Sequence, residues 1–285
     1  MTLGATPEIQ PDQQSRLWTA HVPDYEAVFE PLTNVFADHA LRALALPPGG
    51  RCLDVAAGSG GAALMAARSG SEVVAIDASP GMVRRIRARA GSLPISAAVM
   101  DAARLALPDA RFDAALSVFG VILCPDAGAA LGEMARTVAP GGRVALVTWT
   151  EPQNYALITR LLAAVAAVRG PSPPPPGVPA QLRFADAVAF RALLASAGLG
   201  EIAVTRVEAA LEAPGAAWLG ARLGFAPGIA ALLAAQGGAR EAVLTRFVSD
   251  LERDQGTGPV RLRAVAFLGT GRVLRGTETG SPRAP

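Results

Sequence analysis

The feature that most restricts the fold of this chain is a regular alternation of two kinds of segment between residues 51 and 149. Five short apolar segments have the length and composition of buried strands, and they cover 51–56, 72–76, 95–100, 114–119 and 143–149. Segments with helical spacing follow several of them, at 60–69, from Pro80 onward, and over 131–138. Strands that alternate with helices form a parallel sheet covered on both faces. The sequence therefore predicts an α/β core, in which Pro140-Gly141-Gly142 turns the chain into the fifth strand.

The sequence changes character on both sides of this core, which we place at 47–150. Residues 1–46 are expected to form an N-terminal helical cap, because apolar positions recur at helical spacing. After the core, the sequence predicts two helices and two strands, over 153–168, 186–197, 201–211 and 259–268. The proline-rich segment 171–180 is more typical of a linker than of a strand that docks a partner. We expect the remainder of the core over 151–275, with a helical lid at about 213–257. Residues 276–285 are expected to form a disordered tail.

Composition excludes several classes of protein. The chain has 285 residues, of which 51% are hydrophobic and 18% charged, so it is too apolar to be disordered. Its formal net charge of +2 gives no reason to expect a nucleic-acid partner. The four arginines Arg84, Arg85, Arg87 and Arg89 fall on the side of a predicted helix opposite its apolar stripe, and we expect them to form a solvated face.

Metal, disulfide and membrane roles are also disfavoured. Cys52 and Cys124 are far apart and neither has the spacing of a metal ligand, and the chain has only two histidines. The N-terminus shows no secretory pattern, and the most apolar helical stretch, 155–168, is too short for a bilayer and contains Arg160. We therefore expect a cytoplasmic protein with no metal and no membrane partner.

The turn after the first predicted strand is the sharpest local motif. The sequence Leu-Asp-Val-Ala-Ala-Gly-Ser-Gly-Gly, at 53–61, joins that strand to the first core helix. Gly58 and Gly60 let the backbone turn tightly and let a ligand approach the main chain. The free N–H groups at the start of the helix favour a negatively charged ligand group. By itself the pattern Gly58-x-Gly60-x-x-Ala63 also fits a relaxed dinucleotide-binding fingerprint.

Three aspartates at the ends of successive predicted strands make the turn more informative. Asp77 ends the second strand, where a carboxylate can accept hydrogen bonds from both hydroxyls of a ribose. Asp101 follows the third strand and can accept from an adenine amino group. Asp54 lies just before the glycine turn, where it would repel a pyrophosphate but would suit a ligand with positive charge. Each acid alone is also typical of a helix cap or a turn, but their ordered placement favours a nucleoside site.

These residues belong to a longer set of motifs that resembles a known family. The sequences LDVAAGSGG, AIDASPGMV, MDAARLALPDARFDAALSVFGVI and EMARTVAPGGRVALVTW resemble the motifs of class I S-adenosylmethionine-dependent methyltransferases. The similarity is to the small-molecule type, and within it to the group of quinone-biosynthesis C-methyltransferases. It covers about residues 50–150 strongly and the flanks weakly. Ala56 stands where the family usually has glycine.

The resemblance implies a fold, a cofactor and a set of binding residues. The fold is a Rossmann-like, mostly parallel seven-stranded sheet whose last two strands form an antiparallel hairpin, with N-terminal helices and a helical lid inserted in the hairpin. Asp77 would hold the ribose of S-adenosylmethionine, Asp101 the adenine, and Asp54 the amino group. The implied cofactor-binding residues are Tyr25, Asp54, Ala56, Gly58, Gly60, Asp77, Ala78, Met82, Asp101, Ala102 and Ser117.

The chemistry of methyl transfer demands little of the protein besides alignment, dehydration and sometimes a base. His21 and Tyr25, in the N-terminal helices, are the candidate catalytic residues, although both also suit ordinary packing. Several aromatic residues can wall an apolar acceptor pocket, and Trp149 is the best placed because it ends the fifth strand. The candidate pocket residues are Trp18, Phe119, Trp149, Trp218 and Phe225.

The function that we expect is methylation of an oxygen or carbon atom of an apolar small molecule, in secondary-metabolite or quinone-like biosynthesis. The product of the cofactor would be S-adenosylhomocysteine, and a homodimer is possible. Three alternatives stay open at this point. The fold can catalyse a non-methylating reaction such as a cyclisation, it can serve as a non-catalytic subunit that binds the cofactor, or it can be an NAD-linked oxidoreductase, against which Asp54 argues.

Overall fold

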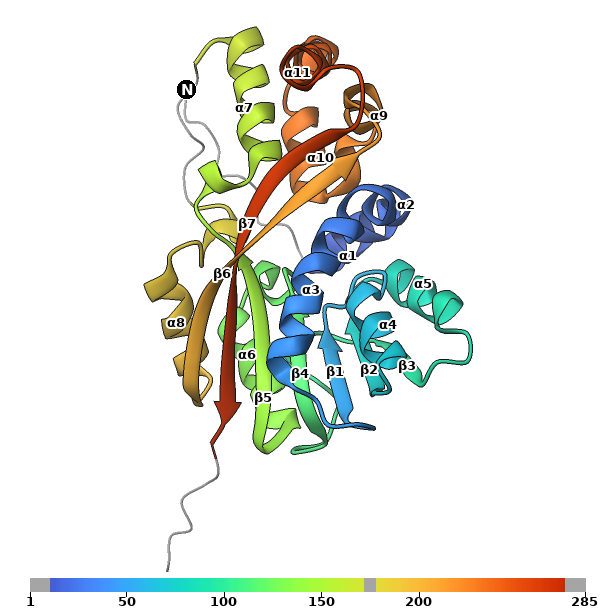
Figure 1. Cartoon of the computed structure of the whole chain (residues 1–285), viewed down its shortest axis with the longest axis vertical. Coiled ribbons are helices and arrows are strands. Elements are labelled where there is room, and N and C mark those ends of the chain that lie inside the picture. The colour runs from blue at the N-terminus through green and yellow to red at the C-terminus, as the bar shows by residue number, and fades with distance from the viewer. Residues whose placement is uncertain (1–10, 172–177, 275–285) are drawn as a thin grey trace, which may run out of the picture.

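The computed structural model describes residues 11–171 and 178–274. A single sheet of seven strands runs through it in the order β3-β2-β1-β4-β5-β7-β6 (Figure 1). Neighbouring strands from β3 to β5 are parallel, whereas β7 is antiparallel to both β5 and β6. The strands are β1 (Arg51–Val55), β2 (Glu72–Asp77), β3 (Ile95–Val99), β4 (Phe112–Val118), β5 (Val138–Trp149), β6 (Leu199–Ala213) and β7 (Val260–Val273). The predicted fold class, with its antiparallel last hairpin, is confirmed.

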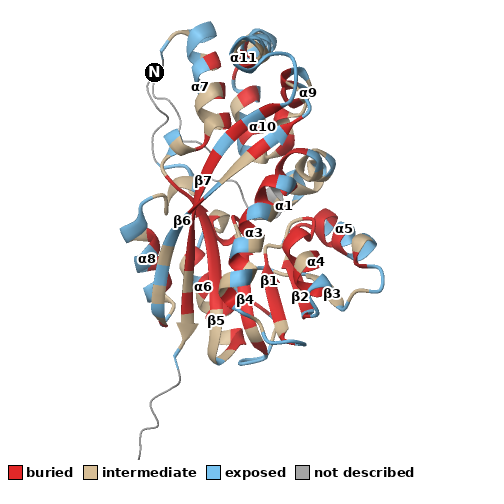
Figure 2. Cartoon of the chain, in the orientation of Figure 1, coloured by how far each residue is buried: buried red, intermediate tan, exposed pale blue. Residues whose placement is uncertain are grey.

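Helices cover both faces of the sheet. One face packs against α3 (Glu30–Leu44), α4 (Gly61–Arg68) and α5 (Pro80–Ala90), and the other against α6 (Ala127–Thr137) and α8 (Ala187–Ser196). The central strands β1 and β4 are almost wholly buried, whereas the edge strands β3 and β6 are partly exposed (Figure 2). Ser79 caps α5 as its sequence predicts, since its hydroxyl accepts a hydrogen bond from the backbone of Met82.

The N-terminal segment contains an irregular helix. It consists of α1 (Pro11–Ala20), α2 (Val22–Asp24), the π-helical turn η1 (Tyr25–Phe29) and then α3. A π-helical turn inside a helix is rare and is often found at functional sites. This one places Tyr25 and Phe29 beside the carboxyl ends of the central strands, as described below.

A second group of helices lies beyond the carboxyl ends of the central strands, where the long strands β6 and β7 extend past the rest of the sheet (Figure 1). Three of its helices, α9 (Ala216–Ala221), α10 (Pro227–Ala234) and α11 (Arg240–Gln255), are inserted between β6 and β7. The fourth, α7 (Ala156–Arg169), packs against α11. Short helical turns complete the described chain at η2 (Val121–Leu123), η3 (Pro152–Asn154), η4 (Ala180–Leu182), η5 (Leu223–Phe225) and η6 (Gly237–Ala239).

Some predicted boundaries are wrong. Val138 is not helical, and Pro140-Gly141-Gly142 lies inside β5 and does not precede it. The register between β4 and β5 shifts between Phe112 and Ala114. The proline and the two glycines lie at this irregularity, inside β5. Glycine is required at position 142, because a Cβ atom there would lie 2.6 Å from the carbonyl oxygen of Asp113.

Two expectations fall on residues that the structure does not describe, and two others are tested on those that it does. The tail at 276–285 lies outside the described residues, and so does most of the proline-rich segment 171–180. Within the two described ranges, no helix combines the length and hydropathy that a membrane crossing requires. The same ranges contain no group of three or more His, Cys, Asp or Glu side chains arranged to hold a metal ion.

Candidate active site

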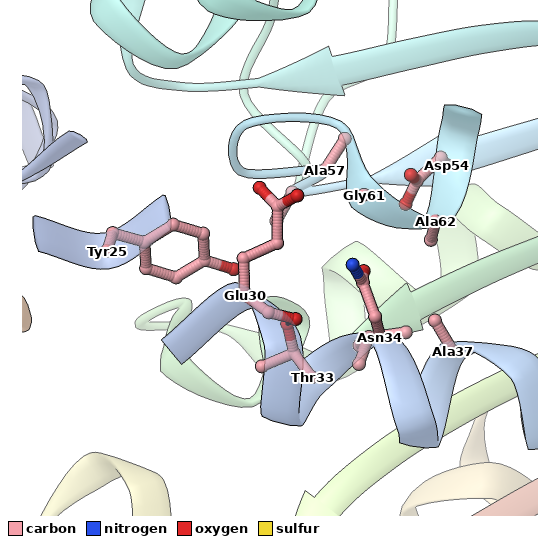
Figure 3. A pocket seen from close by; sticks show the side chains of 11 residues that line it. Tyr25, Glu30, Thr33, Asn34, Ala37, Asp54, Ala57, Gly61 and Ala62 are labelled. Atoms are coloured by element: carbon pink, nitrogen blue, oxygen red, sulfur yellow. Dashed lines mark hydrogen bonds between the residues drawn. The ribbon is translucent and has the colours of Figure 1, made fainter. Parts of the chain in front are cut away.

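A small cavity lies where the β1–α4 turn faces the N-terminal helices. It has a free volume of about 20 Å³. Figure 3 shows Glu30, Thr33 and Asn34 reaching from α3 toward the turn, with Tyr25 at one end and Asp54 at the other. The lining residues are Tyr25, Glu30, Thr33, Asn34, Ala37, Asp54, Ala56, Ala57, Gly61, Ala62 and Val118.

Asp54 is a buried carboxylate with one unsatisfied oxygen. Its side chain accepts a hydrogen bond from the backbone N–H of Ala63, in the first turn of α4, but Oδ2 has no partner. Burial, and secondly the nearby charge of Asp77, raise the pKa of Asp54 to about 7. A buried carboxylate oxygen without a partner is costly. The structure therefore keeps an acceptor available at the end of β1.

Asp77 holds the glycine turn against the end of β2. Its carboxylate accepts hydrogen bonds from the backbone N–H groups of Gly58, at 2.9 Å, and Ser79, at 2.8 Å. Burial raises the pKa of Asp77 to about 6, although these two bonds favour its charged form. Asp54 and Asp77 are thus brought together, as their places at neighbouring strand ends predict.

The backbone of the turn is bent into the left-handed region at three positions. Ala56 has φ of 54°, Gly58 of 56° and Gly60 of 94°. Ala56 carries the strain that a glycine would avoid. Its methyl group is accommodated because position 120 is glycine: a Cβ atom there would lie 2.3 Å from that of Ala56.

Tyr25 closes the site over Gly58. A Cβ atom added to Gly58 would lie 3.0 Å from the Tyr25 hydroxyl, so the phenol rests directly on the glycine backbone. Burial, opposed by a hydrogen bond with Thr33, raises the pKa of Tyr25 well above its ordinary value. A phenol with a raised pKa keeps its proton at neutral pH. In this arrangement Tyr25 is a hydrogen-bond donor and is poorly suited to act as a base.

An ion-pair network fastens the N-terminal helices to the turn. Arg89 on α5 bonds to both carboxylate oxygens of Glu30, at 2.6 and 2.7 Å, and to the carbonyl oxygen of Ser59, at 3.0 Å. The Ser59 hydroxyl also donates to Glu30. Burial works to raise the pKa of Glu30, but the bonds from Arg89 and Ser59 outweigh it, and the pKa lies below its ordinary value.

The expectation of a solvated arginine face is therefore wrong for Arg89 alone. Arg89 is partly buried against Glu30, whereas Arg85 pairs with Glu26 at 2.6 Å and stays exposed. The physical reason is that a helix distant in sequence supplies carboxylates to this face. Arg87 bonds to the carbonyl oxygen of Ala97, and Arg84 is exposed.

The remaining predicted cofactor residues lie around the same sheet edge in different environments. Asp101 is exposed and accepts from the backbone of Ala103, so it caps its own turn. Ser117 is fully buried, and its hydroxyl accepts from the N–H of Val121. Ala102 and Met82 are buried, whereas Ala78 is exposed.

An aromatic cluster adjoins the cavity at the ends of β4 and β5. Phe119 stacks on Trp149 with ring centres 4.1 Å apart, and Trp149 stacks on Tyr155 at 4.4 Å. Phe29 of η1 covers this stack and also stacks on Phe225 at 5.2 Å. Of the predicted pocket residues, the structure thus groups Phe119, Trp149 and Phe225.

The other predicted residues lie apart from that cluster. Trp18 meets the edge of Tyr25 with ring centres 5.9 Å apart. Trp218 lies on α9 with Arg222 over its ring. His21, one of the two candidate catalytic residues, is half-buried and does not line the cavity.

Sequence reasoning missed the polar residues that α3 contributes to the cavity. Glu30, Thr33 and Asn34 recur at helical spacing along one side of α3, and that spacing is a signal that the sequence contains. It also missed Phe29 and Tyr155, for which the sequence offers no comparable signal. Their proximity to Trp149 depends on how distant segments pack.

Comparison with known proteins agrees with this architecture. Residues 53–146 match the model of a family described as a methyltransferase domain. An uncharacterized protein of Mycobacterium tuberculosis is 36% identical over 129 residues, which are 45% of this chain and 47% of that protein. A demethylmenaquinone methyltransferase of a Mycobacterium species is 39% identical over 117 residues, which are 41% and 49%. The chain spans about half the length of these curated relatives.

Among solved structures, a putative methyltransferase from an antibiotic biosynthesis pathway of Anabaena variabilis shares the fold. The TM-score is 0.57 at 20% identity, over 82% of this chain and 96% of that one. Residues 53–146 are thus similar to a methyltransferase domain, and the seven-stranded fold is shared with a solved structure of that kind.

Proposed function

We propose that this protein transfers a methyl group from S-adenosylmethionine to an oxygen or carbon atom of an apolar small molecule. The observation that carries the proposal is the unpartnered, buried Oδ2 of Asp54 beside a glycine turn that Asp77 holds in place. A carboxylate without a partner at this point suits a ligand with an ammonium group, and it would repel the pyrophosphate of a dinucleotide.

The residues present fit this cofactor chemically. Asp54 would pair with its amino group, Asp77 with its ribose, and the backbone at Gly58 would pass close to its methionine portion. When bound, S-adenosylmethionine supplies a methyl group on positively charged sulfur, whose bond breaks as the acceptor forms its own bond and gives up a proton. The aromatic faces of Phe119 and Trp149 would favour that positive charge.

The cavity is closed in this structure. A cavity of about 20 Å³ has room for roughly one water molecule. Cofactor binding therefore requires Tyr25 to leave its place against Gly58. Because Tyr25 begins the π-helical turn η1, we assign this turn as the part of the N-terminal segment that moves.

The groups around the cavity favour an acceptor that loses its proton readily. Glu30 is neutralised by Arg89, and the raised pKa of Tyr25 keeps its hydroxyl protonated. Among the titratable residues of the cavity, Asp54 has the pKa closest to 7, but its carboxylate would be engaged with the cofactor. Alignment and exclusion of water would then provide most of the rate enhancement.

Calorimetry with S-adenosylhomocysteine tests cofactor binding. Asp77→Asn keeps the size of the side chain and should weaken binding by about 1–3 kcal/mol, because a charge-assisted bond to the ribose is lost. Asp186→Asn is the matched control, since Asp186 only caps α8 on the other face of the sheet. Equal affinity of the Asp77→Asn variant and the wild-type protein would contradict the proposal.

A labelled cofactor tests the reaction itself. With S-adenosylmethionine that carries a tritiated methyl group, we expect label in small apolar compounds of a cell extract when the protein is added. Product formation without label would instead favour a non-methylating reaction such as a cyclisation. Cofactor binding without any product would favour a non-catalytic subunit.

The proposal extends to the organisation of the chain. We assign residues 1–46 as the cap over the cofactor, residues 47–150 as the cofactor-binding core, and the helical insertion within 213–257 as a lid over the acceptor. We further propose that the protein acts in the cytoplasm on a small-molecule acceptor, without nucleic acid.

A further inference from the structure

Two arginines of α5 hold neighbouring stretches of the N-terminal segment. Arg85 pairs at 2.6 Å with Glu26, which lies inside the π-helical turn η1. Arg89 binds Glu30, the first residue of α3, through both of its terminal nitrogens. The boundary between η1 and α3 therefore lies between two ion pairs, each with its own arginine.

The two pairs differ in burial and in geometry. The side chain of Glu30 is 8% exposed and is held at both oxygens, whereas the side chain of Arg85 is 45% exposed. Arg89 also reaches Glu26, but at a longer distance of 3.3 Å. A bidentate, mostly buried pair is strong and geometrically specific, while an exposed pair contributes little. The contact at Glu26 is therefore the easier of the two to break.

The stronger pair also holds the glycine turn. Arg89 donates to the carbonyl oxygen of Ser59 at 3.0 Å, and the fully buried Ser59 hydroxyl donates to Glu30. Asp77 binds the same turn one residue earlier, at the N–H of Gly58. The turn is thus fixed at two successive residues, by a strand-end carboxylate and by an ion pair between two helices.

The start of α3 is packed tightly against this turn. A Cβ atom added to Gly61 would lie 3.2 Å from Cγ of Glu30 and closer still to Asn34. A movement of α3 would therefore disturb the turn itself. In contrast, η1 rests on the turn through the ring of Tyr25, which can be withdrawn without moving α3.

Cofactor entry requires that withdrawal. Tyr25 and Glu26 are neighbours in η1, so a displacement of Tyr25 also carries Glu26 away from Arg85. The displacement breaks the bond from the N–H of Glu30 to the carbonyl oxygen of Tyr25, which is part of the π-helical turn. The side chain of Glu30 can stay in its ion pair, and the chain then bends just before it.

We propose that the two arginines have opposite effects on cofactor binding. Arg89 is a positioning residue: through Glu30 and Ser59 it keeps the glycine turn in the shape that accepts the amino-acid portion of the cofactor. Arg85 is a latch: its pair with Glu26 stabilises the closed position of η1 and is broken when the cofactor enters. This inference rests on the proposed function.

Calorimetry with S-adenosylhomocysteine tests the opposite effects. Arg89→Met should weaken binding about tenfold or more, because the turn loses a charge-assisted contact that orients it. Arg85→Met should strengthen binding about two- to fivefold, because a less stable closed state leaves more of the protein ready to bind. Arg84→Met is the matched control, since it removes an exposed arginine of the same helix, and it should bind as the wild-type protein does.

A second ligand separates positioning from a loss of stability. Methylthioadenosine keeps the nucleoside and the sulfur atom but lacks the amino-acid portion, so its binding should change little in Arg89→Met. An arginine that only stabilised the fold would weaken both ligands alike. Arg89→Lys covers the case in which Arg89→Met does not fold. It keeps a charge beside Glu30 but lacks the planar fork, and it should show the same selective loss to a smaller extent.

Hydrogen exchange tests the latch without any ligand. Arg85→Met should speed exchange at the amides of η1 and leave those of α3 protected. Arg89→Met should speed exchange in both segments, because it releases Glu30 as well as the weaker contact with Glu26.

Three results would overturn the inference: weaker or unchanged S-adenosylhomocysteine binding in Arg85→Met, equal weakening of both ligands in Arg89→Met, or unchanged exchange of η1 in Arg85→Met. Failure of the proposed function is distinguishable, because the wild-type protein itself would then not bind S-adenosylhomocysteine. The positioning role of Arg89 would fall with it, and the exchange pattern would still decide whether Arg85 is a latch.

Discussion

The two ends of the η1 turn contact very different surroundings. At Tyr25, the site is polar: Asp54, Asp77 and the Glu30–Arg89 pair surround a backbone turn. At Phe29, four residues away, the surroundings are the rings of Phe119, Trp149 and Phe225. Both regions lie on the same face of the sheet, at the carboxyl ends of neighbouring strands.

The two regions differ in how their polar atoms are satisfied. On the polar side nearly every charge has a partner, and Asp54 Oδ2 is the exception. On the aromatic side the single orphan is the neutral hydroxyl of Tyr155. A charged orphan costs more than a neutral one, so the Asp54 oxygen is the stronger sign of a missing partner.

The aromatic side should contribute the most to stability. Trp149 is 7% exposed and contacts Phe119, Tyr155, Phe29 and Phe36. Trp149→Ala leaves a cavity among these rings and should lower the free energy of unfolding by about 3–5 kcal/mol, as measured by urea denaturation. Trp218→Ala is the control, because Trp218 is only half-buried and lies outside the stack, and it should cost about 1–2 kcal/mol. Equal losses would show that the stack adds nothing special.

The polar side should depend on one ion pair. Arg89→Met leaves the 8%-exposed side chain of Glu30 without its cation and should cost about 2–4 kcal/mol in the same assay. The control is Arg85→Met, which breaks the exposed pair with Glu26 and should cost less than about 1 kcal/mol. A similar small loss for both variants would mean that the N-terminal helices are not fastened through Arg89.

Asp54, on the polar side, should make the free energy of unfolding depend on pH. The ordinary pKa of Asp54 is 3.8 and the folded value is about 7, so between these values the folded protein binds a proton that the unfolded chain has released. The stability from this group is present at low pH and is lost as the pH rises toward 7. Asp54→Asn should therefore be more stable than the wild-type protein at pH 8 by about 1–3 kcal/mol, and similar to it at pH 4.

Urea denaturation at both pH values measures this difference. Asp101→Asn serves as the control, because Asp101 is exposed at the next strand end, and it should follow the wild-type profile. If Asp54→Asn shows the same loss of stability between pH 4 and pH 8 as the wild-type protein, the pKa of Asp54 is not raised by burial. We also expect Asp54→Asn to bind S-adenosylhomocysteine more weakly, so that it gains stability at the expense of function.

The smallest effect concerns backbone strain. Ala56→Gly relieves a positive φ in the glycine turn and should raise the free energy of unfolding by about 0.5–1 kcal/mol. Ala166→Gly, at an exposed position within α7, should instead lower it by about 1 kcal/mol. The opposite signs of these two otherwise identical changes test whether strain is located at Ala56.

Much of the fold could be predicted from the sequence because its signals are local. The alternation of apolar segments and amphipathic helices over 51–149 predicts the parallel strands, and Ser79-Pro80 predicts the start of α5. The same alternation predicts that the glycine turn, which Asp54 precedes, lies beside Asp77 at the end of the neighbouring parallel strand. The exceptions, such as Val138 and the glycines of β5, occur where an irregular strand pairing overrides local preference.

The tertiary structure alone decided what surrounds these residues. Arg89 meets Glu30 across 59 positions of the chain, and that pairing turns a predicted solvated face into a fastening for the N-terminal helices. Tyr155 stacks on Trp149 only because the chain turns back through η3 after β5. That Asp54 and Tyr155 each retain an unpartnered atom is likewise a property of the packed molecule. Local sequence determines which elements form, whereas contacts between distant segments determine which polar atoms remain free for a ligand.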